Sequence, residues 1–242
     1  KEMHDINRSN SFDTIDLGFF RDNWPDQTIK MTISKETLPD TANGVIFAHE
    51  HGFKVSFNLA YGINWDKTLL AKYREQMNKL VRYYISHPDI PRAANFDKRL
   101  VAVLSKEPLK RHCGAGEYMK AYDTEGNEYP CHMFSGNTLN PEEWQKIAGV
   151  NFGDENIYAD AECENCPIYR VCPTCYGMNY LERGNIGCRD KRLCEFNKIN
   201  TLAICGLRYG DLIDKPAEEF TDEDYAELKA VEFLYDALEH DK

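Results

Sequence analysis

Nine cysteines are the residues of this 242-residue chain whose type and spacing could do chemistry. Four of them stand in the stretch CENCPIYRVCPTC, where Cys163 and Cys166 form one C-x2-C pair, and Cys172 and Cys175 form a second. Two intervening residues let both thiolates of a pair reach one metal centre without strain, and such pairs recur in zinc and in iron–sulfur sites. The block therefore predicts metal binding without identifying the metal.

Three kinds of site compete for these thiols. An odd number of cysteines leaves at least one outside any set of disulfides, and the first residues lack the apolar core of a secretion signal. We therefore expect a cytoplasmic protein whose thiols bind metal, with iron–sulfur clusters favoured and a pair of zinc knuckles as the alternative. Cys205, in the apolar run TLAICGL, is predicted to be a buried structural thiol.

Composition excludes some classes of partner. The chain carries 40 acidic and 29 basic side chains, a formal net charge of −11, so a nucleic acid backbone would be repelled. No apolar run of about 18 residues is present, and we expect no membrane span. With 42% apolar residues the chain can build a hydrophobic core without help from its cysteines.

The first hundred residues predict strands separated by helices. Strands are expected at 29–34 and 54–62, and helices at 13–20, 36–51 and 69–84. This order is typical of βαβ units with a parallel sheet. Two or three such units are too few to close a barrel of eight, and the opening KEMHDINRS reads as a loop after a strand that is not here. We therefore expect that the N-terminal part of a larger α/β domain is missing from this chain.

The residues from about Ser105 onward predict a second, loop-rich unit that holds all the cysteines. A hairpin is expected on both sides of TEGN, with Gly126 at the turn. An amphipathic helix is expected at 221–240, capped by Thr221. Its buried side would carry Tyr225, Leu228, Val231, Leu234, Tyr235 and Leu238.

The outer cysteines have a fixed register: Cys113 is followed after twelve residues by Gly126 and after four more by Cys131. This register, which the later cysteines continue, resembles the SPASM domain of radical S-adenosylmethionine enzymes. SPASM domains follow a catalytic barrel and hold two auxiliary [4Fe–4S] clusters, and IKMTIS and NLAYG resemble late units of such a barrel. The fold class implied is α/β, with a partial (β/α) barrel at 1–105, a SPASM domain at 106–215 and a C-terminal helix at 216–242.

The resemblance also implies which cysteines share a cluster. The first auxiliary cluster would be held by Cys113, Cys131 and Cys175. The second would be held by Cys163, Cys166, Cys172 and Cys194. The fourth ligand of the first cluster would be Cys188, or this coordination position would stay open and accept a substrate thiolate.

The C-x3-C-x2-C triplet that holds the S-adenosylmethionine-cleaving cluster in this family is absent from the chain. S-adenosylmethionine and a third [4Fe–4S] cluster are thus expected only in a complete enzyme. The resemblance suggests that Lys30, Thr32 and Ser34 contact the cofactor, with a solvated strand edge as the alternative. It also suggests that the loop with His4, Asp5 and Arg8 lies near an active site, with an exposed loop and a surface ion pair as the alternative.

His132 directly follows Cys131, at a position where sulfatase-maturing relatives carry an aspartate proposed as a base. Histidine can take a proton near neutral pH, or it can hydrogen-bond a cluster sulfur or the backbone. The stretch YPCH is more similar to maturases of ribosomally made peptides, and the resemblance implies an enzyme that forms a thioether crosslink after hydrogen abstraction by a 5′-deoxyadenosyl radical.

Other activities remain open within the same resemblance. They are carbon–carbon crosslinking, epimerisation, sulfatase-type maturation and iron–sulfur catalysis on another side chain or a small molecule. A non-catalytic zinc-binding interaction module is the alternative from a different class. The implied partners are a peptide substrate with leader and core and an electron donor such as flavodoxin or ferredoxin.

Overall fold

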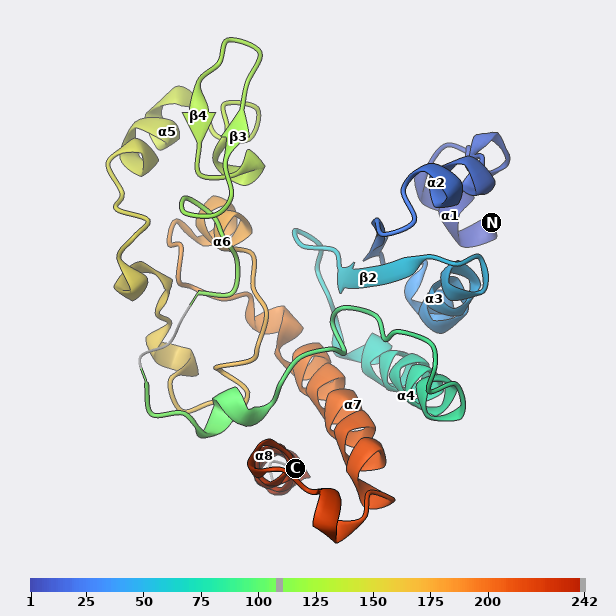
Figure 1. Ribbon diagram of the computed structural model, residues 1–242. Helices are drawn as coiled ribbons and strands as arrows, with labels where there is room; N and C mark the ends of the chain where they lie inside the picture. The colour runs from blue at the N-terminus through green and yellow to red at the C-terminus, as the bar shows by residue number, and fades with distance from the viewer. Residues whose placement is uncertain (108–110, 240–242) are drawn as a thin grey trace. The chain divides into compact units, whose positions relative to one another are not determined.

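The structure is a computed structural model that describes residues 1–107 and 111–239, and its chain divides into two compact units. Unit 1 combines Lys1–Val101 with the chain from Glu195 onward, and unit 2 is Ala102–Cys194. The residues 195–215, which the sequence grouped with the cysteine-rich segment, thus belong to unit 1. Figure 1 shows both units as a mixture of helices and short strands.

A parallel pair of strands forms the sheet of unit 1, as the sequence predicted. β1 (Thr28–Ile33) pairs with β2 (Lys54–Leu59), and α3 (Thr41–Glu50) is the crossover helix between them. No closed sheet is found among the residues that the structure describes, so the partial barrel stays a prediction.

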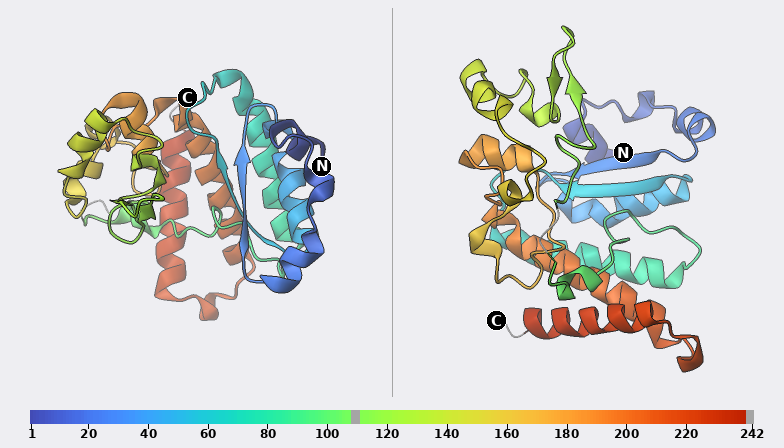
Figure 2. Two further views of the ribbon diagram at one scale, coloured as in Figure 1. Left: turned by 90° about the horizontal axis from the view of Figure 1, so that it is seen from above. Right: turned by 60° about the vertical axis from the view of Figure 1, so that its left-hand side comes forward.

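The two faces of this sheet differ in chemistry. One face carries Met31, Ile33, Val55, Phe57 and Leu59. α3 and α4 (Leu70–Ser86) lie on the same face of the strand pair in both views of Figure 2. The opposite face carries Lys30 and Thr32 beside their register partners Ser56 and Asn58. Since side chains alternate along a strand, the pattern KVSFNL alone produces this division.

The outer edge of β2 is occupied by a loop. Asn95 accepts a hydrogen bond from the backbone N–H of Phe57 at 3.2 Å and donates its amide to the Phe57 carbonyl at 2.5 Å. The N–H of Ala94 donates to the carbonyl of Val55 at 2.8 Å. These bonds satisfy backbone groups that a third strand would otherwise pair.

Three elements near the N-terminus differ from expectation. The predicted opening loop contains α1 (Glu2–Asn7), where Lys1 and Asp5 form an i,i+4 ion pair. The helix expected at 13–20 is α2 (Leu17–Asn23), because Asp16 caps it by accepting from the N–H of Phe19. The helix expected at 36–51 begins only at Thr41, because Pro39 stands in a short 3-10 turn and the Ser34 N–H is bound by the Thr37 hydroxyl.

Two long helices complete unit 1. α7 (Cys194–Ile213) packs on α4, where a Cβ on Gly206 would lie 3.7 Å from Val81 and one on Gly210 would lie 3.5 Å from Ile85. α4 itself agrees with the predicted helix at 69–84, and Cys205 on α7 is 1% exposed, as predicted.

The predicted C-terminal helix is α8 (Asp222–Glu239), and its cap is confirmed: the Thr221 hydroxyl accepts from the N–H of Asp224. The buried side is partly wrong, because Tyr225 and Tyr235 are 49% and 55% exposed. The buried side of α8 carries Glu227 and Ala230 instead. His240 lies outside the described residues.

Unit 2 has little regular structure. The predicted hairpin is present as β3 (Ala121–Tyr122) and β4 (Glu128–Tyr129), with Gly126 at a φ of +86° in the turn. α5 (Pro141–Ala148) starts at a capping box between Asn140 and Glu143, and α6 (Tyr176–Arg183) ends at Gly184. A small core joins these pieces through Ala115, Phe134, Leu139, Ile147, Phe152, Tyr158, Tyr176 and Ile186.

The remaining elements are single 3-10 turns. They are Phe12–Thr14, Leu38–Asp40, Lys67–Leu69, Val101–Leu104, His132–Phe134, Glu155–Tyr158, Ala161–Cys163, Lys191–Leu193 and Ala217–Glu219. None of the helices in the described part of the chain combines the length and the apolar character needed to cross a membrane.

Candidate metal centres

Unit 2 brings its thiols together in two groups. None of the nine cysteines in the described residues is in a disulfide. The first thiol group is Cys113, Cys131 and Cys175. The second thiol group is Cys163, Cys166, Cys172 and Cys194.

Within the first thiol group, neighbouring thiols raise the pKa values of Cys113 and Cys131. Burial raises the pKa of the Cys113 thiol, and the neighbouring Cys175 thiol raises it further. Burial likewise raises the pKa of Cys131, with additional contributions from Cys175 and Cys113. Cys175 therefore lies near enough to Cys113 and Cys131 to act on them electrostatically, although 61 residues stand between Cys113 and Cys175 in sequence.

The second thiol group is coupled in the same way. Burial raises the pKa of Cys194 to about 11, and the Cys172, Cys163 and Cys166 thiols raise it as well. Burial also raises the pKa of Cys172, which the Arg189 guanidinium lowers and the Cys166 and Cys163 thiols raise. These four thiols therefore lie near enough to one another to interact electrostatically.

Local turns place the cysteines of the dense block. The N–H of Cys166 donates to the Cys163 carbonyl at 2.9 Å, and the N–H of Cys172 donates to the Ile168 carbonyl at 2.8 Å. Asp160 caps the turn that holds Cys163 by accepting from the N–H of Glu162 at 3.1 Å. These turns fold the block back on itself, so that cysteines several residues apart in sequence come near one another.

A close helix contact assembles the first thiol group. Cys175 immediately precedes α6, and Cys131 immediately precedes the turn that contains Met133. A Cβ on Gly177 would lie only 2.3 Å from Cβ of Met133, so a glycine is required for this approach. The hydroxyl of Tyr176 accepts from the N–H of His112 at 3.0 Å and so fixes the segment that leads to Cys113.

Two basic side chains accompany the second thiol group. Arg189 is 4% exposed and donates to the carbonyls of Tyr169 and Cys172 at 3.1 and 3.0 Å, and its guanidinium lies 4.3 Å from the centre of the Tyr169 ring. Lys191 donates to Sγ of Cys163 at 2.9 Å and to Oδ2 of Asp160 at 2.8 Å. Positive charge therefore lies beside thiols whose ionised forms would repel one another.

Two other predicted residues have different surroundings. Cys188 is partly exposed in a turn, where its N–H donates to Oδ1 of Asn185 at 3.1 Å and its carbonyl accepts from Nε of Arg183 at 2.9 Å. The side chain of His132 is exposed, and its carbonyl accepts from the hydroxyls of Ser135 and Thr138. Both residues stay candidates for the roles that the resemblance implied.

The thiols are not arranged as a preformed site for one ion. Among the residues that the structure describes, no group of three or more His, Cys, Asp or Glu side chains could hold a metal ion as placed.

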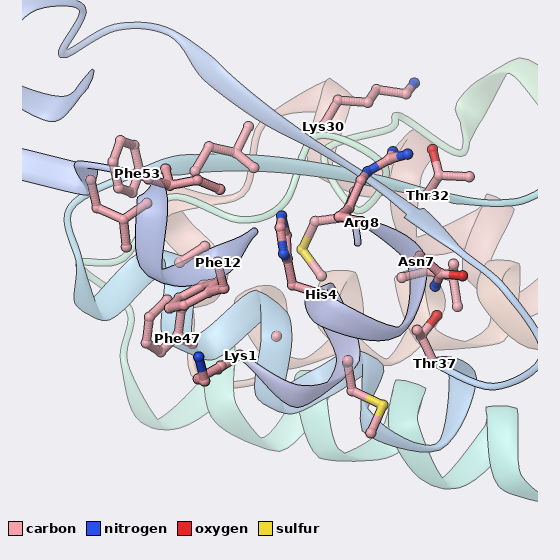
Figure 3. Close-up of a pocket in the computed structure, with 18 of the residues that line it drawn as sticks. Lys1, His4, Asn7, Arg8, Phe12, Lys30, Thr32, Thr37, Phe47 and Phe53 are labelled. Atoms are coloured by element: carbon pink, nitrogen blue, oxygen red, sulfur yellow. The ribbon is translucent and has the colours of Figure 1, made fainter. Parts of the chain in front are cut away.

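Unit 1 has a cavity of about 890 Å³ at the outer edge of β1, lined by α1, α2, β1 and α3. Lys30 and Thr32 line it, together with His4 and Arg8 (Figure 3). Most of its wall is apolar and includes Phe12, Phe20, Trp24, Phe47 and Phe53.

The other residues predicted near this region are engaged elsewhere. Ser34 shares a 3.3 Å hydrogen bond with the Thr37 hydroxyl and accepts from the Asn7 amide at 3.3 Å. Asp5 accepts from the N–H of Phe12 at 2.9 Å, and this bond is the largest cause of its lowered pKa. Ser34 and Asp5 thus serve local structure, while Lys30 and Thr32 are among the residues that line the cavity.

Sequence reasoning missed Asp160, Arg189 and Lys191 at the second thiol group. The run CRDKRLC places three basic residues and an aspartate, Asp190, between Cys188 and Cys194, which is a signal that could have been used. Asn58, on the polar face of the sheet, was also missed, although it alternates with buried Phe57 and Leu59.

Comparison with protein-family models, with curated proteins and with solved structures gave no match to this chain.

Proposed function

We propose that unit 2 is a SPASM-type domain that holds two auxiliary [4Fe–4S] clusters, one on each thiol group. The observation that carries this proposal is that the thiols fall into two separate sets: Cys175 raises the pKa of Cys113 and Cys131, whereas Cys163 and Cys166 raise the pKa of Cys172 and Cys194. Four thiolates are the usual protein ligands of a [4Fe–4S] cluster, and three leave one position for Cys188 or for a substrate thiolate.

The surroundings of the second thiol group fit such a cluster. Arg189 is buried, and its Nε has no hydrogen-bond partner among the described residues. A buried cation with an unused donor suits a centre of negative charge, because it can pair with the sulfur of an anionic cluster. Metal binding and local folding are coupled in cysteine-rich loops, so the proposal includes an adjustment of the thiol side chains when a cluster binds.

The activity we propose is that of a radical S-adenosylmethionine peptide maturase in the cytoplasm, with thioether formation as the first candidate reaction. When bound, auxiliary clusters transfer single electrons at low potential. The chain lacks the C-x3-C-x2-C motif, so it would not cleave S-adenosylmethionine by itself. The polar sheet face with Lys30 and Thr32, next to the β1 cavity, is our candidate for the cofactor contact.

A zinc-binding interaction module is the second candidate, and it has one observation in its favour. The C-x2-C pairs that begin at Cys163 and Cys172 satisfy zinc spacing as well as iron spacing. Such a module would be colourless and would have no redox chemistry.

Anaerobic reconstitution of the full chain with iron and sulfide separates the two. We expect a brown protein with broad absorption near about 400 nm and about eight iron and eight sulfide ions per chain, about four for each cluster. The variants Cys131→Ser and Cys172→Ser should each lose about half of the iron, because they remove a ligand from different groups.

Cys205→Ser is the matched control, since Cys205 lies in unit 1 and should leave the iron content unchanged. A protein that takes up two zinc ions and no iron would overturn the iron–sulfur proposal. Equal and complete loss of iron from both ligand variants would overturn the assignment of two separate centres.

A further inference from the structure

The Lys191 ammonium group donates a hydrogen bond to a cysteine thiol of the second thiol group. Its ammonium nitrogen lies 2.9 Å from Sγ of Cys163. The residue opens the short 3-10 turn that leads into Cys194, three positions later. One cation is therefore linked to two members of the second thiol group, directly to Cys163 and through the backbone to Cys194.

Asp160 holds the ammonium group in this place. Its Oδ2 accepts from Lys191 at 2.8 Å and from the backbone N–H of Arg189 at 2.8 Å. Asp160 is 7% exposed, whereas the second acid near the ammonium, Glu162 at 3.5 Å, has a side chain that is 78% exposed. A buried carboxylate restricts the lysine far more than an exposed one, because solvent screens the exposed pair.

We propose that Lys191, positioned by Asp160, raises the reduction potential of the cluster on the second thiol group. This inference rests on the proposed function. Adding one electron to a cluster makes it more negative, and an N–H donor with a full positive charge against a ligand sulfur stabilises the reduced state more than the oxidised state. No bond is formed or broken in this step, and dithionite or another titrant supplies the electron.

The first thiol group provides an internal comparison. The cation that acts on it is Arg111, which lowers the pKa of Cys113 and pairs with Glu155 at 2.8 Å and Glu117 at 3.1 Å. Each of the two cations has two carboxylate partners, so the difference lies in the contact to sulfur: Lys191 donates to Sγ of Cys163 at 2.9 Å, whereas the groups that Arg111 donates to are the two carboxylates and the Ala115 carbonyl. The two clusters would therefore differ in potential, with the cluster beside Lys191 the easier to reduce.

Anaerobic redox titration of the reconstituted full chain, followed by absorbance and electron paramagnetic resonance, tests the inference. The Cys131→Ser background simplifies the titration because only the second cluster remains. In that background Lys191→Met, which keeps the length and removes the charge and the donor, should shift the midpoint to a more negative potential at unchanged iron content. Lys191→Arg should restore most of the shift, because it keeps both the charge and the donor.

Lys120→Met is the matched control. Lys120 lies in the hairpin of the same unit, where its partner is Glu128, and its removal should leave the midpoint unchanged. An iron-loaded Lys191→Met protein with the wild-type midpoint would overturn the inference, and so would loss of the second cluster's iron, which would make Lys191 a structural residue. A wild-type chain that binds no iron would instead overturn the proposed function, and the inference with it.

Discussion

Gly187 lies against the backbone carbonyl of Ala159, so closely that a Cβ on the glycine would stand 2.1 Å from that oxygen. The contact joins the loop before Cys188 to the segment that leads into Asp160 and Cys163. Because the obstructing atoms belong to the backbone and not to a flexible side chain, no rotamer change can relieve the clash. The packing of these two loops thus depends on one hydrogen atom in place of a methyl group.

Replacement of Gly187 by alanine tests this contact. We expect Gly187→Ala to lower the free energy of unfolding of unit 2 by about 1–3 kcal/mol, because overpacking forces the two backbone segments apart. Urea unfolding followed by tyrosine and tryptophan fluorescence measures the effect. Gly149→Ala is the control, since nothing lies within 4 Å of its Cβ position, and an equal loss in both variants would contradict the steric explanation.

A buried carboxylate on α8 binds the backbone of the segment at Leu100 and Val101. Glu227 is 6% exposed and accepts from the backbone N–H groups of Leu100 at 2.8 Å and Val101 at 3.2 Å. Glu227→Ala would leave both donors buried and unpaired, so we expect a loss of about 2–3 kcal/mol in the free energy of unfolding of unit 1. Glu227→Gln keeps an acceptor and should cost less.

Glu223→Ala is the control for this prediction. Glu223 is also on α8, but its side chain is 75% exposed and pairs with exposed Arg99, so its removal should cost less than about 1 kcal/mol. Thermal denaturation by circular dichroism compares the variants. Similar losses from Glu223→Ala and Glu227→Ala would show that the buried hydrogen bonds do not stabilise the helix.

His49 predicts a pH dependence of stability. Burial lowers its pKa, while the hydrogen bond to the Phe53 carbonyl acts in the opposite direction. The neutral ring fits its site: Nδ1 lies 3.1 Å from the Phe53 carbonyl as the donor, and Nε2 lies 2.8 Å from the Tyr84 hydroxyl as the acceptor. The Tyr84 oxygen in turn accepts from the N–H of Ala93 at 3.0 Å.

Because the folded pKa of His49 is below the unfolded value of about 6.5, its stabilising effect is fully present above that pH and is lost as the pH falls toward the folded value. We expect the urea midpoint to decrease below about pH 6.5 and His49→Gln to decrease less steeply. His51→Gln, at an exposed position two residues later, is the control. Identical pH slopes for wild type and His49→Gln would refute the assignment.

Thiol reactivity should separate Cys205 from the cysteines of unit 2. Burial raises the pKa of Cys205 to about 12, with a further contribution from Glu227. Thiolate is the reactive form, so iodoacetamide at about pH 8 should leave Cys205 unmodified in the folded protein and alkylate it in urea. Peptide mass mapping of the metal-free chain gives the readout, and partly exposed Cys188 serves as the labelled reference. Rapid labelling of Cys205 without denaturant would contradict its buried position.

The local features of this protein were predictable from its sequence. The turn at Gly126, the Thr221 cap and α4 follow from residue types within one or two turns of chain, and the alternation in KVSFNL determines which side of β2 is buried. The errors arose where a nearby hydrogen bond competed with the apolar pattern. The delayed start of α3 after Pro39 and the delayed start of α2 after its cap at Asp16 are examples.

Sequence spacing by itself determined that four cysteines of unit 2 occur as two C-x2-C pairs, because this spacing is a property of the chain alone. Only the tertiary structure decided that Lys191 lies against Cys163. It also decided that Glu227, and not Tyr225, lies on the buried side of α8. Such contacts join residues far apart along the chain. They depend on how the loops pack against a shared core and on which buried charges pair with each other there. A local sequence pattern does not contain that information.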